Sequence, residues 1–216
     1  SNSPTGPFKA EPEAIKGSFS IDPAVFKDDD GAYYMYFGGL WGGQLQRWRT
    51  GSFNSDQAES PTAFLPADDE PALLPLVAKM SDSLLEFAET PKELEILDDK
   101  GNLLLSGDND RRFFEAAWLH KHNGKYYFSY STGDTHFICY AIGNNPYGPF
   151  IYTGRILNPV VGWTSHHSVC VIDEKTYLFY HDSSLSKGIT HLRSVKVAEI
   201  KYRPDGSIVT LEPYKL

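Results

Sequence analysis

The sequence predicts an all-β protein built from repeats of one unit of short strands. Three segments share a plan of strand, tight turn and second strand, and they cover residues 22–38, 115–131 and 166–181. Aromatic and β-branched residues fill the second strands, as in a sheet that is packed on both faces. Clear helical periodicity is missing along the chain. The repeated hairpin therefore predicts strands throughout.

The turns of these hairpins carry residues that tolerate a positive φ angle. They are Asp30-Gly31, Asn123-Gly124 and Asp173-Glu174. The first two dipeptides are typical of a two-residue hairpin loop. We therefore expect a tight hairpin at the start of each unit.

Two further short strands are expected after each hairpin. Their predicted starting points are Leu76 and Leu94, then Phe137 and Phe150, then Arg193 and Ser207. Four antiparallel strands in a repeated unit are the pattern of a propeller blade, and a two-sheet sandwich is the alternative.

One polar residue opens the first strand of every unit, and this shared register favours the propeller. The three residues are Asp22, Glu115 and His166. The innermost strands of a propeller run beside its central axis. We therefore expect the three side chains to converge at one end of the central channel.

A proline–glycine turn marks the limits of the units. The stretch NNPYGPF at 144–150 separates the third and fourth strands of the second unit, and the similar stretch SNSPTGPF opens the chain. The start of the chain therefore resembles the tail of an earlier blade. The predicted parts are a tail and linker at 1–18 and blades at 19–104, 105–160 and 161–216. Because a closed propeller has at least four blades, we expect the C-terminal part of a larger propeller.

Composition limits the class of partner. The 216 residues are 41% hydrophobic, and 20 Lys and Arg against 28 Asp and Glu give a net charge of -8. Without a basic run, nucleic acid and anionic membranes are disfavoured, and a neutral substrate fits better. No apolar stretch approaches the roughly 20 residues of a membrane span, and no signal peptide is visible. The localisation stays open, with the cytoplasm favoured over secretion, and we expect the natural N-terminus to lie upstream of Ser1.

The two cysteines are expected to be free thiols. Cys139 and Cys170 lie in apolar, strand-like runs. Buried free cysteine is the ordinary state of such positions, and no metal knuckle or redox pair is indicated.

Two carboxylates that face one cavity are the minimum set for glycoside hydrolysis. Glu115 follows two phenylalanines and precedes Ala116, an apolar setting that raises a carboxyl pKa and suits an acid catalyst. The alternative is a structural ion pair with Arg111 or Arg112. The register shared with Asp22 favours the acid, although a capping role in a turn remains open for Asp22.

Other polar and aromatic residues have two interpretations each. His166 is either a hydrogen-bonded core histidine or a polar group on the channel axis near a metal. Trp41, Trp118 and Trp163 either stack on a sugar or belong to the core. Arg193 either orients a carboxylate or sugar hydroxyl or is an ordinary surface arginine.

Three separated stretches, at 20–31, 112–136 and 166–181, resemble glycoside hydrolase family 43, in the order that the family has them. These are five-bladed propellers that include β-xylosidases and α-L-arabinofuranosidases. The segments 3–8, 41–46 and 191–200 are also similar to family segments. The resemblance covers essentially the whole chain, of which about three blades are present.

The resemblance implies a role for each candidate site residue. Glu115 would be the general acid, and Asp22 the carboxylate that tunes its pKa and orients it. His166 would lie near the central ion or water site, where a structural calcium could bind, although the chemistry requires no cofactor. The sugar pocket would be lined by Arg193, Trp41, Trp118 and Thr135.

The departure from the family pattern concerns the general base, which in the family is an Asp at the start of the first blade. That blade and the next are absent here. Family members are typically inverting, so the base must hold a water opposite the acid. We expect a glycosidase for xylo- or arabino-oligosaccharides that is inactive or weakly active as this chain alone. The alternative is a non-catalytic carbohydrate-binding or interaction module.

The expected partners follow from the missing blades. A small oligosaccharide or monosaccharide would be the ligand. Uncovered sheet faces and edges recruit other chains. We therefore expect self-association or a complementary N-terminal fragment. Whether the chain is truncated, cleaved or naturally short stays open.

Overall fold

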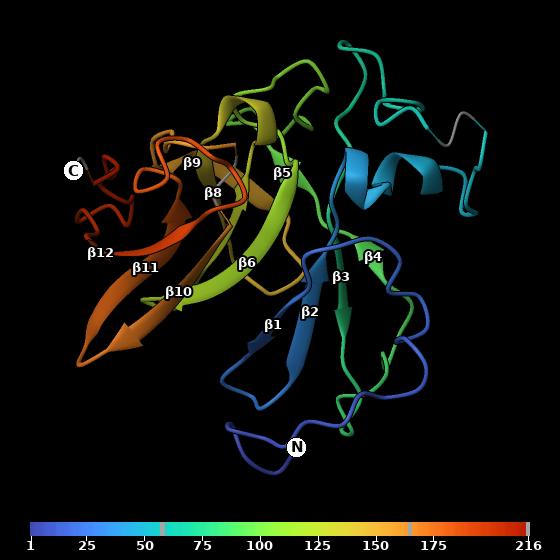
Figure 1. The fold of residues 1–216 in the computed structure, drawn as a ribbon, viewed down its shortest axis with the longest axis horizontal. Coiled ribbons are helices and arrows are strands. Elements are labelled where there is room, and N and C mark those ends of the chain that lie inside the picture. The colour runs from blue at the N-terminus through green and yellow to red at the C-terminus, as the bar shows by residue number, and fades with distance from the viewer. Residues whose placement is uncertain (57–58, 164–165, 215–216) are drawn as a thin grey trace.

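A computed structural model describes residues 1–56, 59–163 and 166–214, and its strands form three sheets side by side (Figure 1). The first sheet contains β1 (Ala24–Lys27), β2 (Tyr33–Phe37), β3 (Leu76–Lys79) and β4 (Lys92–Glu93). The second contains β6 (Glu115–His122), β7 (Lys125–Ser131), β8 (Ile138–Gly143), β9 (Phe150–Leu157) and the added β5 (Ile96–Leu97). The third contains β10 (His167–Ile172), β11 (Lys175–Asp182) and β12 (Ser194–Ile200).

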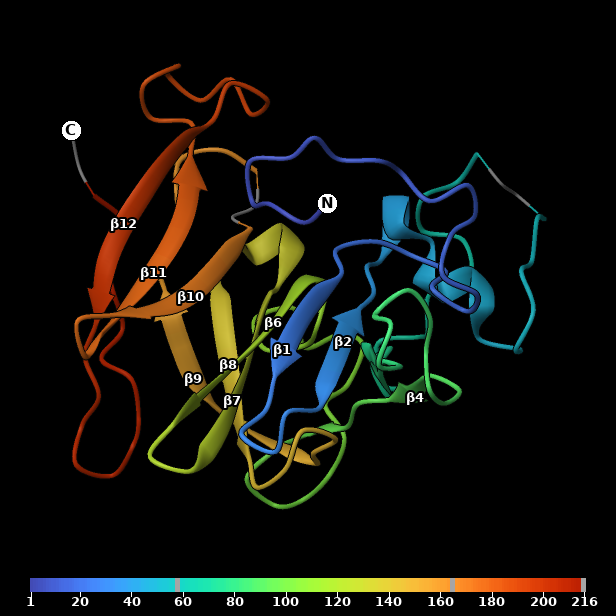
Figure 2. The ribbon, with the colours of Figure 1, turned by 90° about the horizontal axis from the view of Figure 1, so that it is seen from below.

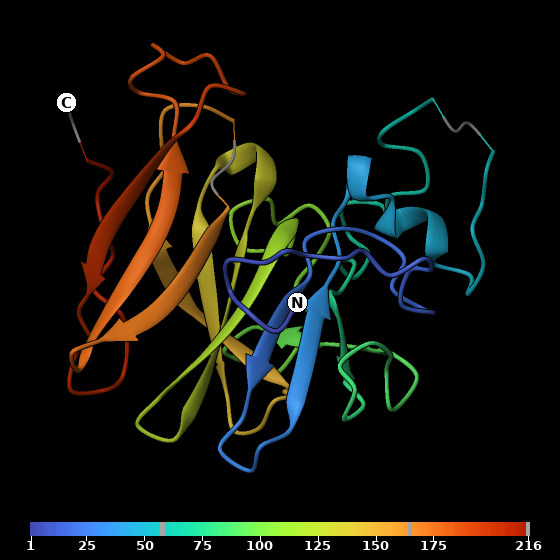
Figure 3. The ribbon, with the colours of Figure 1, turned by 60° about the horizontal axis from the view of Figure 1, so that its bottom comes forward.

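The second sheet lies between the other two, as Figures 2 and 3 show. Its innermost strand β6 contacts both β1 and β10, which are the first strands of the flanking sheets. This is the arrangement of three consecutive propeller blades with their first strands toward one axis. The all-β prediction is therefore confirmed, and the described helices are the short 3-10 turns η1 (Trp41–Gly43), η2 (Leu45–Trp48) and η3 (Gly133–Thr135). No helix of the described chain has the length and apolar character that a membrane crossing needs.

Two of the three predicted hairpins have the expected two-residue turn. His122 pairs with Lys125, and the intervening Asn123 and Gly124 have φ angles of 48° and 74°. Ile172 pairs with Lys175 around a turn in which both φ angles are likewise positive. Turns of this kind match the twist of the flanking strands.

The first hairpin differs from the prediction. Lys27 pairs with Tyr33, so Asp30-Gly31 lies inside a longer loop over 28–32. The Asp28 N–H still bonds across the hairpin, to the Ala32 carbonyl at 2.9 Å. Its carboxylate contacts the second sheet, where Lys121 Nζ and the Tyr126 hydroxyl donate to it at 2.9 and 2.7 Å.

The fourth strands are complete only in the second unit, where the NNPYGPF turn lies between β8 and β9 as predicted. In the first unit, Leu94 is buried in the core and β4 precedes it. The next segment, β5, leaves that sheet and pairs in parallel with β9. In the third unit, the stretch after Ser207 makes isolated bridges, one of which joins Leu211 to Leu157 of β9. Both predicted strands are therefore only partly right. Each segment pairs with its own unit near its start, through the Leu94 N–H to the Pro75 carbonyl and through the antiparallel bridge of Tyr202 to Ile208, and then ties its blade to β9.

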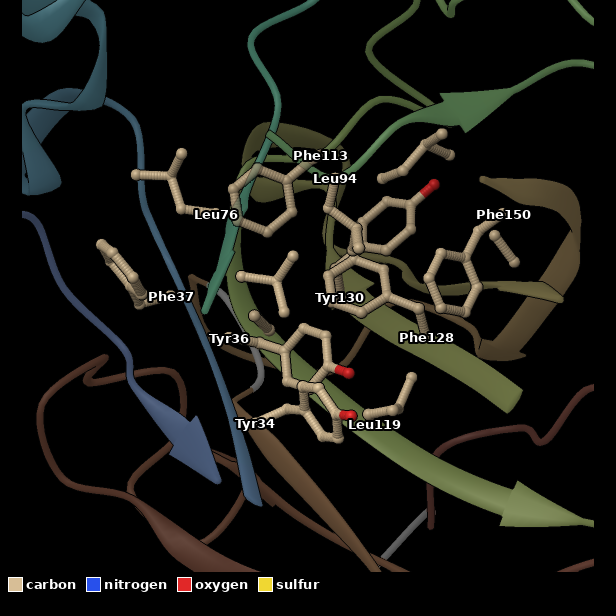
Figure 4. Close-up of a cluster of buried hydrophobic side chains, with 14 of the residues drawn as sticks. Tyr34, Tyr36, Phe37, Leu76, Leu94, Phe113, Leu119, Phe128, Tyr130 and Phe150 are labelled. Atoms are coloured by element: carbon tan, nitrogen blue, oxygen red, sulfur yellow. The ribbon is translucent and has the colours of Figure 1, made fainter. Parts of the chain in front are cut away.

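The core lies between the first and second sheets and continues between the second and third. Figure 4 shows the first part, an aromatic cluster with side chains from β2, β6, β7 and β9. Its labelled members include Tyr36, Phe37, Phe128, Tyr130 and Phe150. A second cluster, which includes Leu178 and Tyr180 of β11, joins the third sheet to the second.

The prediction of two buried cysteines holds for one of them. Cys139 of β8 is buried and Cys170 of β10 is exposed, and both are free. Cys170 stands opposite Tyr177 on the face of the third sheet that points away from the second. No part of the described chain covers this face. The prediction of burial for Cys170 was wrong because it rested on the apolar character of the neighbouring residues alone.

Candidate active site

The three polar residues predicted to open the inner strands lie at matching ends of those strands. Glu115 is the first residue of β6, Asp22 lies two positions before β1, and His166 immediately precedes β10. Asp22 Oδ2 accepts a hydrogen bond of 3.1 Å from the Ala116 backbone N–H. Its other oxygen lies 3.7 Å from His166 Nδ1. Asp22 thus contacts residues at the start of both other inner strands.

A β-bulge directly follows Glu115. The pairing of β6 with β7 shifts register between Glu115 and Trp118, and Ala116 inside the bulge has a φ of 61°. The bulge turns the Ala116 N–H out of the sheet and toward Asp22, whose own φ is 58°. A left-handed conformation costs a non-glycine residue roughly 1–2 kcal/mol. Bulges and strained residues are concentrated at functional sites.

The segment that carries Asp22 is held against a glycine-rich loop. The Ser20 hydroxyl donates to the Gly43 carbonyl at 2.7 Å and accepts from the Gly39 N–H at 3.0 Å. A Cβ on Gly39 would lie 2.6 Å from Ile21 Cγ1 and 3.4 Å from Glu115 Cβ. Glycine at position 39 therefore permits the close approach that places Asp22 beside the start of β6.

Glu115 is half-buried and follows two buried phenylalanines, Phe113 and Phe114. The two arginines that the sequence offered as ion-pair partners bind the preceding loop. Arg111 Nε donates to Asp108 at 2.7 Å, and Arg112 donates to the Ser106 carbonyl and to Asn109. Both guanidinium groups are thus engaged on the loop over 106–109.

Aromatic rings form a row beside this acid. Trp41 packs edge-on against Phe114 with ring centroids 5.3 Å apart. Trp163 lies 6.0 Å from Trp41, and His136 lies 5.4 Å from Trp163. Trp163 is 41% exposed, so the row has an open end. Burial lowers the pKa of His136, which favours a neutral ring there.

Arg193 reaches the same region through a residue that the sequence analysis did not single out. Arg193 Nε donates to the Thr190 carbonyl at 3.0 Å, and its Nη1 lies 3.4 Å from His181 Nε2. The His166 backbone N–H donates to the same His181 nitrogen at 3.0 Å. Burial, with Arg193 and His166 nearby, lowers the pKa of His181 to about 4.

The position of His181 could have been predicted from the register of the hairpin between β10 and β11. The two-residue turn at 173–174 sets a register in which His167 pairs with Tyr180. Continuing that register by one residue places position 166 opposite position 181. His167 itself points into the core, where its Nε2 lies 2.7 Å from the Ser129 hydroxyl.

Two other predicted sugar-binding residues, Trp118 and Thr135, have contacts elsewhere in the fold. Trp118 packs against the core cluster between the second and third sheets. The Thr135 hydroxyl donates to the Asn109 carbonyl at 2.8 Å and lies 2.7 Å from the Thr132 hydroxyl. The structure therefore brings Asp22, Glu115, His166, Trp41 and Arg193 into one region, whereas Trp118 packs against the core between two sheets and Thr135 bonds to a neighbouring loop.

A calcium site would need more oxygen ligands than this region supplies. Among the residues that the structure describes, no group of three or more His, Cys, Asp and Glu side chains could hold a metal ion. Calcium takes six to eight oxygen ligands, whereas His166 offers a nitrogen and Asp22 a single carboxylate. These two residues do not form a calcium cage by themselves.

Curated relatives match almost the entire chain, whereas no protein-family model does. A xylosidase/arabinosidase from Bacteroides ovatus is 58% identical over 212 residues, which are 98% of this chain and 63% of the relative. The xylosidase/arabinosidase 43A of Humicola insolens is 58% identical over 214 residues, covering 99% of this chain and 65% of the relative. This chain therefore spans less than two thirds of the length of these relatives.

Solved structures have the same fold. One is a GH43 β-xylosidase/α-arabinofuranosidase from a compost microbial metagenome, in complex with xylotriose and in a calcium-free form. It has a TM-score of 0.95 and 63% identity, with 100% of this chain and 65% of that chain covered. A GH43_1 enzyme from Xanthomonas citri complexed with xylotriose has a TM-score of 0.93 and 53% identity, with 99% and 63% covered. With this identity and this fold over its whole length, the chain belongs to glycoside hydrolase family 43.

Proposed function

We propose that this chain carries the acid side of the active site of a glycosidase for xylo- or arabino-oligosaccharides. The observation that carries the proposal is the bond from the Ala116 N–H to Asp22, which places a second carboxylate next to Glu115. Glu115 is the general acid in this proposal, and Asp22 orients it and tunes its pKa. Relatives named xylosidase/arabinosidase support the substrate class.

The proposed reaction inverts the configuration of the sugar. Glu115 gives its proton to the oxygen of the glycosidic bond as that bond breaks. A general base on the opposite face of the sugar takes a proton from the attacking water. We assign the base to a part of the protein outside this chain, since the relatives are longer than the segment that matches.

The proposed pocket surrounds these carboxylates with stacking and hydrogen-bonding groups. Trp41 would stack on a sugar ring, and the guanidinium of Arg193 would donate to its hydroxyls. Trp118 and Thr135 would complete the lining. Trp118 also packs against the core, which supports the alternative role, that of a core residue.

His166 is the proposed residue nearest to a central ion or water. Most ligands of a calcium ion would have to be water oxygens or groups outside the described residues, so no step of the proposed chemistry uses a metal. Melting the protein with calcium and with a chelator tests this part. An unchanged melting temperature would contradict a structural calcium.

The activity test is paired. The chain and a protein extended to the length of its relatives are assayed on two aryl β-xylosides, one with a good leaving group and one with a poor one. We expect the chain to be slower by roughly 10²–10⁴, because acid–base assistance contributes that much. In the extended protein, Glu115→Gln should abolish turnover of the poor leaving group and spare the good one. Glu93→Gln, an exposed control on β4, should change neither.

Two outcomes would contradict the proposal. Full activity in the chain alone, unaffected by Glu115→Gln, would mean that the acid is elsewhere and that no base is missing. Binding of xylotriose without turnover in the extended protein would favour the alternative, a non-catalytic carbohydrate-binding module.

We also propose that a protein partner covers the third sheet. Alternate residues of β11, including Leu178 and Tyr180, pack toward the second sheet. On the opposite face, Phe179 pairs with Val197 of β12, which is 53% exposed, and the nearby Val195 is 75% exposed. An apolar sheet face of this kind attracts a partner. A second copy of the chain or a complementary N-terminal fragment would supply it.

A further inference from the structure

A continuous set of contacts runs from Asp22 to Arg193 through two histidines. His166 Nδ1 lies 3.7 Å from Asp22 Oδ1. The backbone N–H of His166 donates to His181 Nε2 at 3.0 Å, and that nitrogen lies 3.4 Å from Arg193 Nη1. The contacts therefore join the proposed pKa-tuning carboxylate to the proposed sugar-binding guanidinium.

The two donors define the state of His181. A backbone N–H and a guanidinium can only donate hydrogen bonds. Because both approach His181 Nε2, that nitrogen must present its lone pair, and the ring proton of the neutral imidazole must be on Nδ1. His181 is thus an acceptor that lies between the backbone before β10 and the side chain before β12.

Arg193 has a second fixed contact. Its Nε donates to the carbonyl of Thr190 at 3.0 Å. The Thr190 carbonyl and His181 Nε2 hold different nitrogens of one planar group, and two such contacts set its orientation as well as its position. Arg193 itself is exposed, so its remaining N–H groups can meet a ligand.

We propose that His181 is a positioning residue of the sugar site. It orients the Arg193 guanidinium toward the pentose and fixes the backbone at position 166, so that His166 stays beside Asp22. The part of this inference that concerns sugar rests on the proposed function, whereas the hydrogen-bonding role does not.

The test compares two substitutions at one position. In His181→Phe the ring remains and the acceptor is lost. In His181→Gln the side-chain oxygen restores an acceptor near the place of Nε2. Calorimetric titration with xylotriose should show binding about tenfold weaker in His181→Phe, a change of about 1.4 kcal/mol, and within about threefold of the original protein in His181→Gln. His191→Phe, on the exposed loop before Arg193, is the control and should leave affinity unchanged.

A second measurement does not depend on sugar. Nitrogen-15 NMR reports hydrogen exchange at the His166 amide, which donates to His181 Nε2. Exchange at this amide should be slow in the original protein and in His181→Gln, and faster in His181→Phe. Should the phenylalanine variant fail to fold, His181→Ala gives the same comparison without its bulk.

The outcomes separate the two proposals. A protein that binds no xylotriose would contradict the proposed function, and the exchange data would still decide the role of His181. Unchanged exchange in His181→Phe would overturn the positioning role. So would faster exchange in His181→Gln equal to that in His181→Phe, or undiminished affinity in a His181→Phe variant of a sugar-binding protein.

Discussion

The backbone N–H of Ala116 donates to Asp22 Oδ2 at 3.1 Å, across the junction of the first and second sheets. Both residues have left-handed φ angles, and the donor is free because the β-bulge removes it from the ladder of β6. Ala116 is almost fully buried, at 1% exposed. The bond therefore satisfies a buried donor and also fixes a carboxylate beside Glu115.

Substitutions at Asp22 should separate those two effects. Asp22→Ala leaves the buried Ala116 N–H without this acceptor and should lower the free energy of unfolding by about 1–3 kcal/mol. Asp22→Asn keeps an oxygen acceptor and should lose less stability, while still slowing turnover of poor leaving groups because the charge is gone. Urea unfolding and the xyloside assay measure the two effects. Equal destabilisation by both substitutions would mean that the hydrogen bond is not the source of the stability.

The close approach at Gly39 gives a second prediction. In Gly39→Ala the new methyl would lie 2.6 Å from Ile21 Cγ1, so Ile21, the residue before Asp22, must shift. Overpacking of this kind costs about 1–3 kcal/mol, and activity should fall with stability. Gly42→Ala is the matched control, because a Cβ there meets nothing within 4 Å. Urea unfolding of the two variants makes the comparison, and similar losses in both would refute the steric argument.

The sequence predicted those parts of the fold that local chemistry determines. The turn at Asn123-Gly124 fixed one hairpin, and the repeated hairpin register brought Asp22, Glu115 and His166 to one end of the inner strands. The bulge after Glu115 was not predicted, because Ala116 gives no local sign of a left-handed conformation. It is a consequence of the pairing between β6 and β7 and of the acceptor on another sheet.

Contacts between sheets explain the remaining differences. Nothing within the β5 sequence indicates that this segment leaves the first sheet, since its partner β9 lies more than 50 positions away. Cys170 has a sequence typical of a buried strand, but its face of the third sheet has no covering layer in the described chain. Burial there depends on a neighbour that the local sequence does not specify.

The uncovered face of the third sheet predicts a concentration-dependent assembly. The chain should associate at micromolar concentration, and Val197→Lys together with Val195→Lys should shift it toward the monomer, because two charges would be buried in the contact. Leu105→Lys alters an exposed leucine outside that sheet and should leave the assembly unchanged. Light scattering over a concentration series measures the change. A monomeric original chain would remove the basis for the proposed partner.

The last prediction concerns pH and a histidine on β6. His120 is buried, with its Nε2 at 2.8 Å from the Tyr202 hydroxyl, and the His122 ring stacks on Tyr202 at 3.6 Å. Burial, with a smaller contribution from His122, lowers the pKa of His120 to about 3. In the unfolded chain a histidine has a pKa of about 6.5. Between these two values the unfolded state binds one more proton than the folded state does.

The contribution of His120 to the free energy of unfolding should therefore be fully present above about pH 6.5 and should be lost progressively as the pH is lowered toward 3. The contribution of this one histidine is roughly 1 kcal/mol per pH unit in that window. Other buried histidines and the carboxylates also titrate. The contribution of His120 is therefore measured as the difference in pH dependence between the original protein and a variant without this histidine. Urea unfolding at pH 7, 6 and 5 should give a shallower pH dependence for His120→Gln than for the original protein, whereas the exposed control His191→Gln should keep the original slope. Parallel curves for all three proteins would show that His120 takes up its proton equally in the folded and unfolded states, contrary to its burial against Tyr202.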